Sequence, residues 1–320
     1  ILHSRYRHNW QEPDNIAAPD WLKANLGEEA YNVIWKPLIQ VKFGDHHEQI
    51  SAAWMWHRIW RVARSREWLL AGESFGYFEE GSFTLYRALY QALQAMPNIT
   101  MRFNTPARQI LTSAGRASSV VTDNETFQAD AVISTLALAQ LCRLLEAYND
   151  PYFKSLSQIQ MIGVVCMLLS LRRPYSSNFW LNINDPRVPY NGVIEISNLN
   201  MHLRQAGLNI LYVPYYMATN MPRYSYSDQQ LYEEYLGTLQ AVNPEFNADW
   251  VKEWFVFRAP YAQAICTTGF SKLIPTTRSP LPGLYISDST QFYPEDRTLS
   301  AAIRFGRLAA QYSMEDLHAV

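Results

Sequence analysis

The sequence predicts a fold of the α/β plus α+β class, and three stretches carry that prediction. Residues 131–133 form a short apolar strand pattern that leads into a helical pattern at 138–145, as in an α/β layer. Residues 151–282 are rich in strand patterns, and one amphipathic helix at 228–241 interrupts them. Residues 283–320 return to a strand followed by a helix. We therefore expect an antiparallel, helix-covered sheet inserted into an α/β layer.

The chain divides into four predicted regions. Residues 1–97 form a mainly helical part, whose clearest pattern places Trp56, Ile59 and Trp60 on one face of a helix at 50–64. Residues 98–150 begin with a strand pattern at 99–103 and contain the strand and helix of the α/β layer. The strand-rich region 151–282 and the final region 283–320 follow.

Composition excludes several classes of protein. Hydrophobic residues make up 48% and charged residues 18%, so the chain can bury a core and is not disordered. The net charge of −2 argues against nucleic-acid binding, which normally needs a basic excess. The apolar run 161–171 has about half of the ~20 residues that a membrane span needs. We therefore expect a protein without a membrane span or a nucleic-acid partner.

The cysteines indicate the compartment. Cys142, Cys166 and Cys266 are odd in number and far apart, without metal-ligand spacing. This predicts no metal site and no disulfide framework, which fits a reducing cytoplasmic location. No signal peptide is visible, and the chain opens with Ile1 rather than Met, which suggests a fragment or a processed chain.

The segment 283–312 carries the strongest functional signal. A short strand at 284–287 ends at Asp288, a polar loop follows, and a helix begins near Thr298. One face of that helix is small, with Ala302, Gly306 and Ala310, so the helix can pack closely against a sheet or a cofactor. Its N-terminus offers free backbone N–H groups and the positive end of the helix dipole. Asp288, at the strand end, is placed to accept hydrogen bonds from a sugar-like chain, although a ligand-free strand-end cap is the alternative.

This segment resembles the C-terminal flavin-binding motif of the FAD-dependent amine oxidase, phytoene desaturase and protoporphyrinogen oxidase superfamily. Ser287 stands where that motif usually has Gly, Asp288 matches its Asp, and Gly306 and Arg307 match its Gly-Arg. Tyr-Pro-Glu-Asp-Arg at 293–297 is similar to a bacterial subgroup that includes relatives of UDP-galactopyranose mutase.

Four further stretches agree with that resemblance. They are Trp-Lys-Pro-Leu at 35–38 with Lys-Phe-Gly at 42–44, the turn at 76–81, the strand at 104–110 and the strand at 129–135. In the turn, Glu80 replaces the first Gly of a Gly-Gly pair and leaves Gly81; in the strand at 104–110, Ala107 stands where Val is usual.

The resemblance implies a partial FAD-binding (Rossmann-like) domain with a mixed-sheet substrate-binding domain, and FAD as cofactor. It implies that Asp288 contacts the ribityl or phosphate part of FAD and that Thr298, Leu299 and Ser300 lie near the isoalloxazine ring. Its flavin-binding residues are then Ser287, Asp288, Arg297, Thr298, Leu299, Ser300, Ala107 and Gly81. For Arg297 a salt bridge to Glu295 or Asp296 is the alternative to an anion or flavin contact.

The Gly-x-Gly-x-x-Gly loop that cradles a dinucleotide diphosphate does not occur in the sequence. In the superfamily this loop lies near the N-terminus, so we expect a truncated chain that binds FAD weakly or not at all.

Substrate contacts are predicted from two clusters. Arg58, with Arg61, Arg64 and Arg66, suits a phosphorylated or carboxylated substrate, although a solvated helix face is the alternative. Tyr212 and Tyr215 lie on a predicted strand and either line a substrate cavity or pack.

These observations predict an FAD-dependent oxidoreductase acting on a small-molecule substrate, with no catalytic acid or base assigned. Two alternatives stay open: a non-redox flavoprotein similar to UDP-galactopyranose mutase, and an inactive fragment or binding module. The sequence also leaves substrate identity, electron acceptor and oligomeric state open.

Overall fold

A computed structural model describes residues 9–64, 75–185, 187–190 and 192–318. Its α-helices are α2 Gln11–Asp14, α3 Ala18–Leu26, α4 Glu28–Ala30, α5 Lys36–Phe43, α6 Ala52–Arg64, α7 Phe83–Gln94, α8 Leu138–Leu144, α9 Pro151–Ser157, α10 Met201–Gln205, α11 Asp228–Val242 and α12 Leu299–His318. A π-helical turn, Tyr31–Trp35, joins α4 to α5, and a 3₁₀ turn, Ser289–Phe292, follows the last strand.

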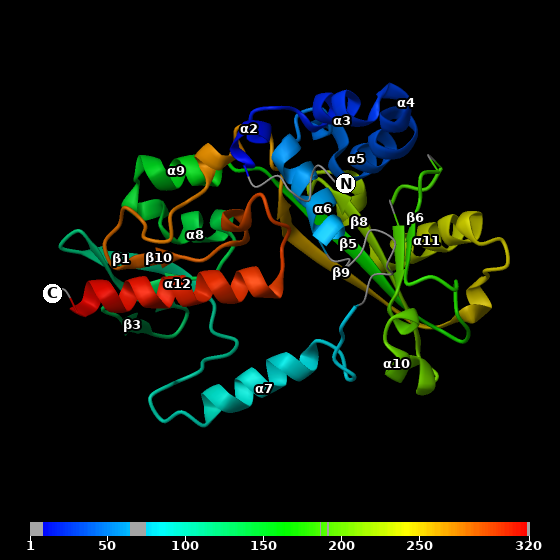
Figure 1. Ribbon diagram of the computed structural model, residues 1–320. Coiled ribbons are helices and arrows are strands. Elements are labelled where there is room, and N and C mark those ends of the chain that lie inside the picture. The colour runs from blue at the N-terminus through cyan, green and yellow to red at the C-terminus, as the bar shows by residue number, and fades with distance from the viewer. Residues whose placement is uncertain (1–8, 65–74, 186, 191, 319–320) are drawn as a thin grey trace.

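The strands form three sheets (Figure 1). Their bounds are β1 Ala107–Ser113, β2 Arg116–Thr122, β3 Thr126–Gln128, β4 Val132–Ser134, β5 Met161–Leu171, β6 Trp180–Asn182, β7 Gly192–Glu195, β8 Asn209–Met217, β9 Val251–Ala264 and β10 Leu284–Ile286. The sheets have the orders β1-β2-β3, β10-β4 and β6-β7-β8-β5-β9.

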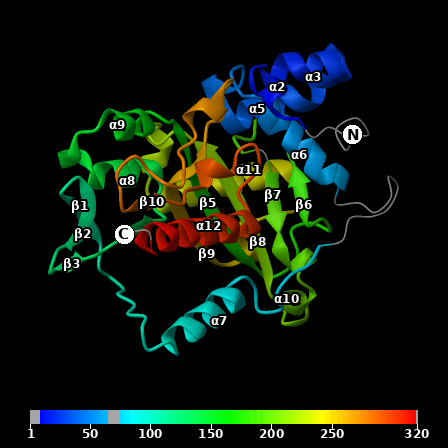
Figure 2. The same ribbon diagram turned by 60° about the vertical axis from the view of Figure 1, so that its left-hand side comes forward.

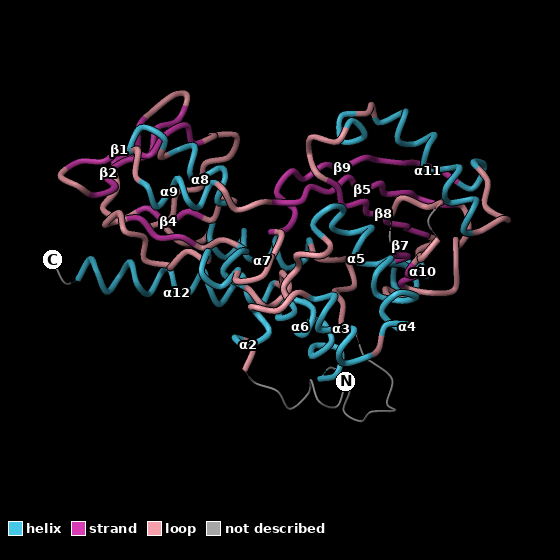
Figure 3. The backbone as a smooth tube through the Cα atoms, turned by 90° about the horizontal axis from the view of Figure 1, so that it is seen from above, coloured by secondary structure: helices cyan, strands magenta, loops and turns pink. Residues whose placement is uncertain are grey.

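The five-stranded sheet is antiparallel throughout and has a different environment on each face. Leu211, Val213 and Met217 of β8 are buried, and they pack in one core with Leu231 and Tyr235 of α11. The intervening residues of β8 are only partly buried and face the side on which α5 contacts that strand. Figure 3 shows α11 on one side of the sheet and α5 and α6 on the other.

Local sequence explains why α11 forms and holds this position. Ser227 accepts a hydrogen bond from Gln230 N, and Gln230 Oε1 accepts one from Ser227 N, which closes a capping box at the helix start. Leu231, Tyr235 and Leu239 recur every four residues and form the buried stripe of the helix.

The α/β layer lies at the other end of the molecule. Strands β10 and β4 pair in parallel, with Leu284 opposite Val132 and Ile286 opposite Ser134. Figure 2 shows α12 running across β10 at this end, with α8 and α9 beside it and the antiparallel sheet β1-β2-β3 at the edge. The layer therefore places the start of α12 near the five-stranded sheet.

Most expected elements are confirmed, and one is wrong. The expected helix at 50–64 is α6, and the strand and helix of the final region are β10 and α12. The expected strand at 99–103 is absent, because these residues form a loop in which Phe103 packs against Tyr90 of α7 at 5.9 Å between ring centroids instead of joining a sheet.

Candidate functional site

The end of β10 holds the predicted flavin-contacting pair, Ser287 and Asp288. Ser287 N donates to the carbonyl of Ser134 at 2.9 Å, which extends the β10–β4 ladder by one bond. Asp288 is buried, and its Oδ1 accepts hydrogen bonds from Thr290 N at 2.8 Å and from Thr290 Oγ1 at 2.6 Å. Burial raises the pKa of Asp288, although these hydrogen bonds oppose the rise. The structure thus shows the capping role of Asp288, and its contact with FAD stays a prediction.

Three successive charged residues in the loop between this turn and α12 each contact a different partner. Glu295 accepts from Arg304 at 3.0 Å, and Asp296 accepts from Arg58 of α6 at 2.9 Å. Arg297 Nη2 instead donates to Tyr216 Oη at 3.4 Å and to Gln263 Oε1 at 3.3 Å. The alternative that Arg297 forms a salt bridge with Glu295 or Asp296 is therefore wrong, because other arginines take both carboxylates.

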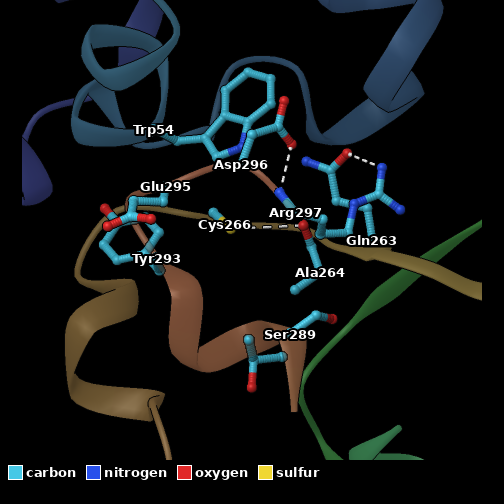
Figure 4. Close-up of a pocket in the computed structure, with 10 residues that line it drawn as sticks. Trp54, Gln263, Ala264, Cys266, Ser289, Tyr293, Glu295, Asp296 and Arg297 are labelled. Atoms are coloured by element: carbon cyan, nitrogen blue, oxygen red, sulfur yellow. Dashed lines mark hydrogen bonds between the residues drawn. The ribbon is translucent and has the colours of Figure 1, made fainter. Parts of the chain in front are cut away.

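Arg297 and its neighbours surround a small cavity at the start of α12. Figure 4 shows Arg297 and Gln263 side by side, with Trp54, Asp296 and Tyr293 around them. Its volume is about 20 Å³, which is on the scale of a single water molecule.

The first turn of α12 supplies hydrogen-bond donors next to this cavity. Thr298 Oγ1 accepts from Ala301 N at 3.1 Å, and Thr298 O accepts from Ala302 N at 3.0 Å. Within the described ranges, the amides of Leu299 and Ser300 have no acceptor. Two free N–H groups at the positive end of a helix of 20 residues, next to Arg297, favour negative charge on a group bound there.

Lys42 of α5 is a residue of this region whose role the sequence did not reveal. Its Nζ lies 5.0 Å from the ring centroid of Trp54, 5.0 Å from that of Tyr216 and 5.5 Å from that of Phe43. Burial holds the pKa of Lys42 well below its usual value, and the positive charges of Arg58 and Arg297 lower it further.

A larger pocket, which Lys42 helps to line, lies between α5, α6 and β6. It has a volume of about 440 Å³. Its walls are mainly apolar, and its charged side chains are Lys42, Arg58 and Arg61. The predicted substrate residue Arg58 therefore lines a pocket, and its ring contact with Trp54, at 4.9 Å, holds the guanidinium against the pocket wall. Arg66 of the predicted arginine cluster lies outside the described residues.

The two predicted substrate tyrosines face opposite sides of the sheet. Tyr212 is half-buried and lies on the same face of β8 as Tyr216. Tyr215 is buried in the core beneath α11, and its hydroxyl accepts from Arg223 at 3.2 Å. Side chains alternate between the two faces of a strand, so Tyr212 and Tyr215 do not line one cavity together, and Tyr215 packs in the core. Neither tyrosine lines the 440 Å³ pocket.

Gly81 and Ala107 lie away from both pockets. The turn before Gly81 is held by Asn200, whose Nδ2 donates to Phe78 O at 3.3 Å and to Glu79 O at 3.1 Å. Ala107 begins β1 and pairs with Thr122 in the three-stranded sheet. Neither residue lines the cavity near Arg297 or the pocket at Lys42, and their flavin contacts stay predictions.

Two negative findings apply to the described part of the chain. It contains no group of His, Cys, Asp and Glu side chains that could hold a metal ion. It also has no helix with the length and apolar character required to cross a bilayer.

The family model of flavin-containing amine oxidoreductases matches residues 12–312, which is nearly the whole chain. The chain belongs to this family. The resemblance to the amine oxidase superfamily is thereby confirmed, and with it FAD as the cofactor and oxidoreductase as the enzyme class. A search of curated proteins found no match.

Several solved structures share the fold. An oxidoreductase from Methanosarcina mazei is 18% identical with a TM-score of 0.65, and the match covers 92% of this chain and 68% of that one. Cyclohexylamine oxidase from Brevibacterium oxydans IH-35A is 12% identical with a TM-score of 0.65, with 98% of this chain and 71% of that chain covered. Reduced UDP-galactopyranose mutase is 15% identical with a TM-score of 0.60, with 85% and 61% covered. The chain thus corresponds to roughly two thirds of each solved chain.

Proposed function

We propose that this chain forms the ring-binding half of an FAD site, in which a small organic substrate is oxidised by hydride transfer. The first turn of α12 carries this proposal, because its free Leu299 and Ser300 amides lie next to Arg297. A bound flavin supplies the hydride-accepting chemistry, and the protein supplies position and electrostatics. The two amides and the guanidinium favour the negative charge that the cofactor gains on reduction.

The other residues have positioning roles in this proposal. Ser287 and Asp288 hold the end of β10 where the ribityl or phosphate part is predicted to pass, and Thr298 holds the start of α12 through its bond to Ala301 N. The ion pair of Arg58 with Asp296 fixes the loop before Arg297. The 440 Å³ pocket next to Lys42 is the proposed substrate space.

The diphosphate of FAD needs backbone donors that the printed sequence lacks, because it contains no Gly-x-Gly-x-x-Gly loop. One side of α7 is apolar and exposed, with Phe83 at 67% and Leu89 at 51%. Figure 1 shows α7 standing apart from the sheets. We infer that a further polypeptide segment covers this face and completes the nucleotide half of the site.

The first experiment is a visible absorbance spectrum of the purified chain, before and after addition of FAD and gel filtration. Retained flavin bands would support an FAD site built by these residues alone. Loss of the flavin would support the need for the further segment, and the spectrum would then be repeated with that segment supplied.

A matched pair of variants tests the role of the helix start. Leu299→Pro removes one free N–H at the first helical position, where proline is tolerated, and Leu299→Ala keeps that N–H. We expect Leu299→Pro to weaken FAD retention or lower the flavin reduction potential, with Leu299→Ala unchanged. Equal behaviour of the two variants would contradict the proposed role of this amide.

A second candidate is a non-redox flavoprotein similar to UDP-galactopyranose mutase. The cations Lys42, Arg58 and Arg61 favour it, because a diphosphate needs such partners. Saturable binding of a UDP-sugar would support this candidate, and flavin reduction by an apolar substrate would oppose it. An inactive binding module is the third candidate, and flavin reduction by any substrate would exclude it.

A cytoplasmic location stays a prediction, which the three free cysteines support.

A further inference from the structure

The pocket at Lys42 has an amphipathic lining. Phe43, Trp54 and Met55 form buried apolar walls, and Ile34, Val62 and Trp180 are exposed apolar residues that also line it. An apolar body placed here would be removed from water on several sides, which favours its binding.

The charged residues that the structure describes in the pocket lining all have the same sign. They are Lys42, Arg58 and Arg61, and no carboxylate occurs among the described lining residues. Asp296 pairs with Arg58 from outside this lining and compensates one of the three charges. Among the described residues, no carboxylate lies within ion-pairing distance of Lys42 or Arg61.

Lys42 has no ion-pair partner among the described residues. Aromatic ring faces surround its ammonium, and no described residue accepts a hydrogen bond from it. Ring faces stabilise an ammonium but do not replace the hydrogen bonds of water. Its lowered pKa, caused first by burial and then by Arg58 and Arg297, is the expected result of such a position. An anion beside Lys42 would supply the missing acceptor and counter-charge.

We propose that this pocket binds a molecule with an apolar body and an anionic head, a carboxylate or a phosphate, which lies against Lys42, Arg58 and Arg61. This rests on the proposed function in one respect: a ligand held here is oxidised only if the flavin ring lies next to Arg297.

The same charges disfavour an ammonium group. An amine substrate that enters in its protonated form would meet three cationic side chains and, among the lining residues that the structure describes, no carboxylate. Like charges at close range repel strongly where the protein partly excludes water, so these cations disfavour a bound ammonium. The substrate class of this chain therefore differs from that named for cyclohexylamine oxidase, whose fold it shares.

The test compares head groups on one apolar body by isothermal titration calorimetry without FAD. Octyl phosphate, octanoate and octylamine differ in the head alone, and inorganic phosphate measures the anion without the body. We expect octyl phosphate and octanoate to bind, and inorganic phosphate to bind much more weakly. We expect no binding of octylamine. Octylamine binding as tight as octanoate, or equal binding of inorganic and octyl phosphate, would overturn the proposal.

Matched variants identify the pocket as the binding site. Lys42→Met and Arg61→Gln keep side-chain size and remove one charge each. The controls are Lys252→Met and Arg204→Gln, which remove exposed charges outside the pocket. A charge-assisted hydrogen bond contributes enough that each pocket variant should weaken octyl phosphate about tenfold. Unchanged binding in both pocket variants would overturn the proposal, and circular dichroism confirms that each variant is folded.

This experiment separates the proposal from the function on which it rests. Anion binding by a chain that retains no FAD would leave the pocket assignment intact and would indicate only that the flavin site needs the further segment. Retained FAD with a preference for octylamine would contradict the pocket assignment alone.

Discussion

Arg58 Nη1 donates to Asp296 Oδ2 at 2.9 Å, which joins residues 238 positions apart in the chain. Arg58 belongs to α6 and lines the proposed substrate pocket, and Asp296 belongs to the loop that leads to α12. The ion pair therefore fixes the wall of the pocket relative to the helix start that is proposed to lie against the flavin. Burial opposes ionisation of Asp296, but Arg58, Lys42 and Arg297 offset it and lower the pKa of this carboxyl.

Asp296→Asn should destabilise the protein, because it leaves Arg58, Lys42 and Arg297 without their shared carboxylate. We expect a loss of about 1–3 kcal/mol in the free energy of unfolding. The lower part of that range is the better expectation, since the Arg58 side chain is 34% exposed and water screens it. Urea unfolding at pH 7 measures the loss.

The matched control is Asp123→Asn, which removes the partner of Arg108 in an exposed pair and should change stability little. The pH dependence gives a second check. A carboxyl whose pKa is lowered by folding contributes stability above its unfolded pKa and loses it as pH falls through its folded pKa. Wild type should therefore lose this contribution below about pH 4, and Asp296→Asn should lack that part of the acid loss. Identical acid profiles would contradict the assignment.

Lys42→Met should have the opposite effect on stability. Folding lowers the pKa of Lys42, so the unfolded state binds more protons and wild-type stability rises with pH up to the unfolded value near ~10.4. Methionine removes the desolvated charge, and with it the rise of stability with pH. The free energy of unfolding of the variant should therefore equal or exceed that of wild type at pH 7, and this advantage should disappear towards pH 10. Urea unfolding at both pH values tests this, and a difference that is independent of pH would show that Lys42 is not desolvated.

The sequence predicted those helices and strands whose signals lie within one short segment of the chain. The strand and helix on either side of Asp288 could be predicted because apolar periodicity and the Ser287-Asp288 and Gly306-Arg307 pairs lie within one short segment. The opposite placement of Tyr212 and Tyr215 also had a signal in the sequence, since Leu211 and Val213 show which face of the strand is apolar.

The side chains that meet around Lys42 and Arg297 could not be predicted in the same way. They include Trp54 of α6, Tyr216 of β8 and Gln263 of β9, and no spacing along the chain relates them. Their meeting depends on the packing of helices against the sheet, which periodicity does not encode. For the same reason the sequence left open whether Arg297 contacts Glu295 or Asp296, which Arg304 and Arg58 occupy instead.

Tyr293→Phe should destabilise a buried polar network near the site. The Tyr293 hydroxyl lies 2.6 Å from Ser51 Oγ and hydrogen-bonds to the buried carboxylate of Asp14. Its removal leaves Asp14 short of a donor in a place that water does not reach, so we expect a loss of about 1–3 kcal/mol in the free energy of unfolding. Tyr285→Phe is the matched control, because its hydroxyl bonds to Asp316, whose side chain is 43% exposed and can turn to water. Equal losses in the two variants would contradict the importance of the network.

Gly192→Ala should disturb the edge of the five-stranded sheet that borders the pocket. A Cβ at Gly192 would lie 2.6 Å from the carbonyl oxygen of Leu181, which is backbone and cannot turn away. The β6–β7 pairing must therefore shift, and with it Trp180 and Asn182 of the pocket lining. We expect a loss of about 1–3 kcal/mol in the free energy of unfolding. Gly237→Ala, at an exposed position of α11 with open space around the added Cβ, should instead gain about 0.5–1 kcal/mol. Opposite signs in urea unfolding would support the contact at Leu181, and a stabilised Gly192→Ala would show that β6 does not pair as described.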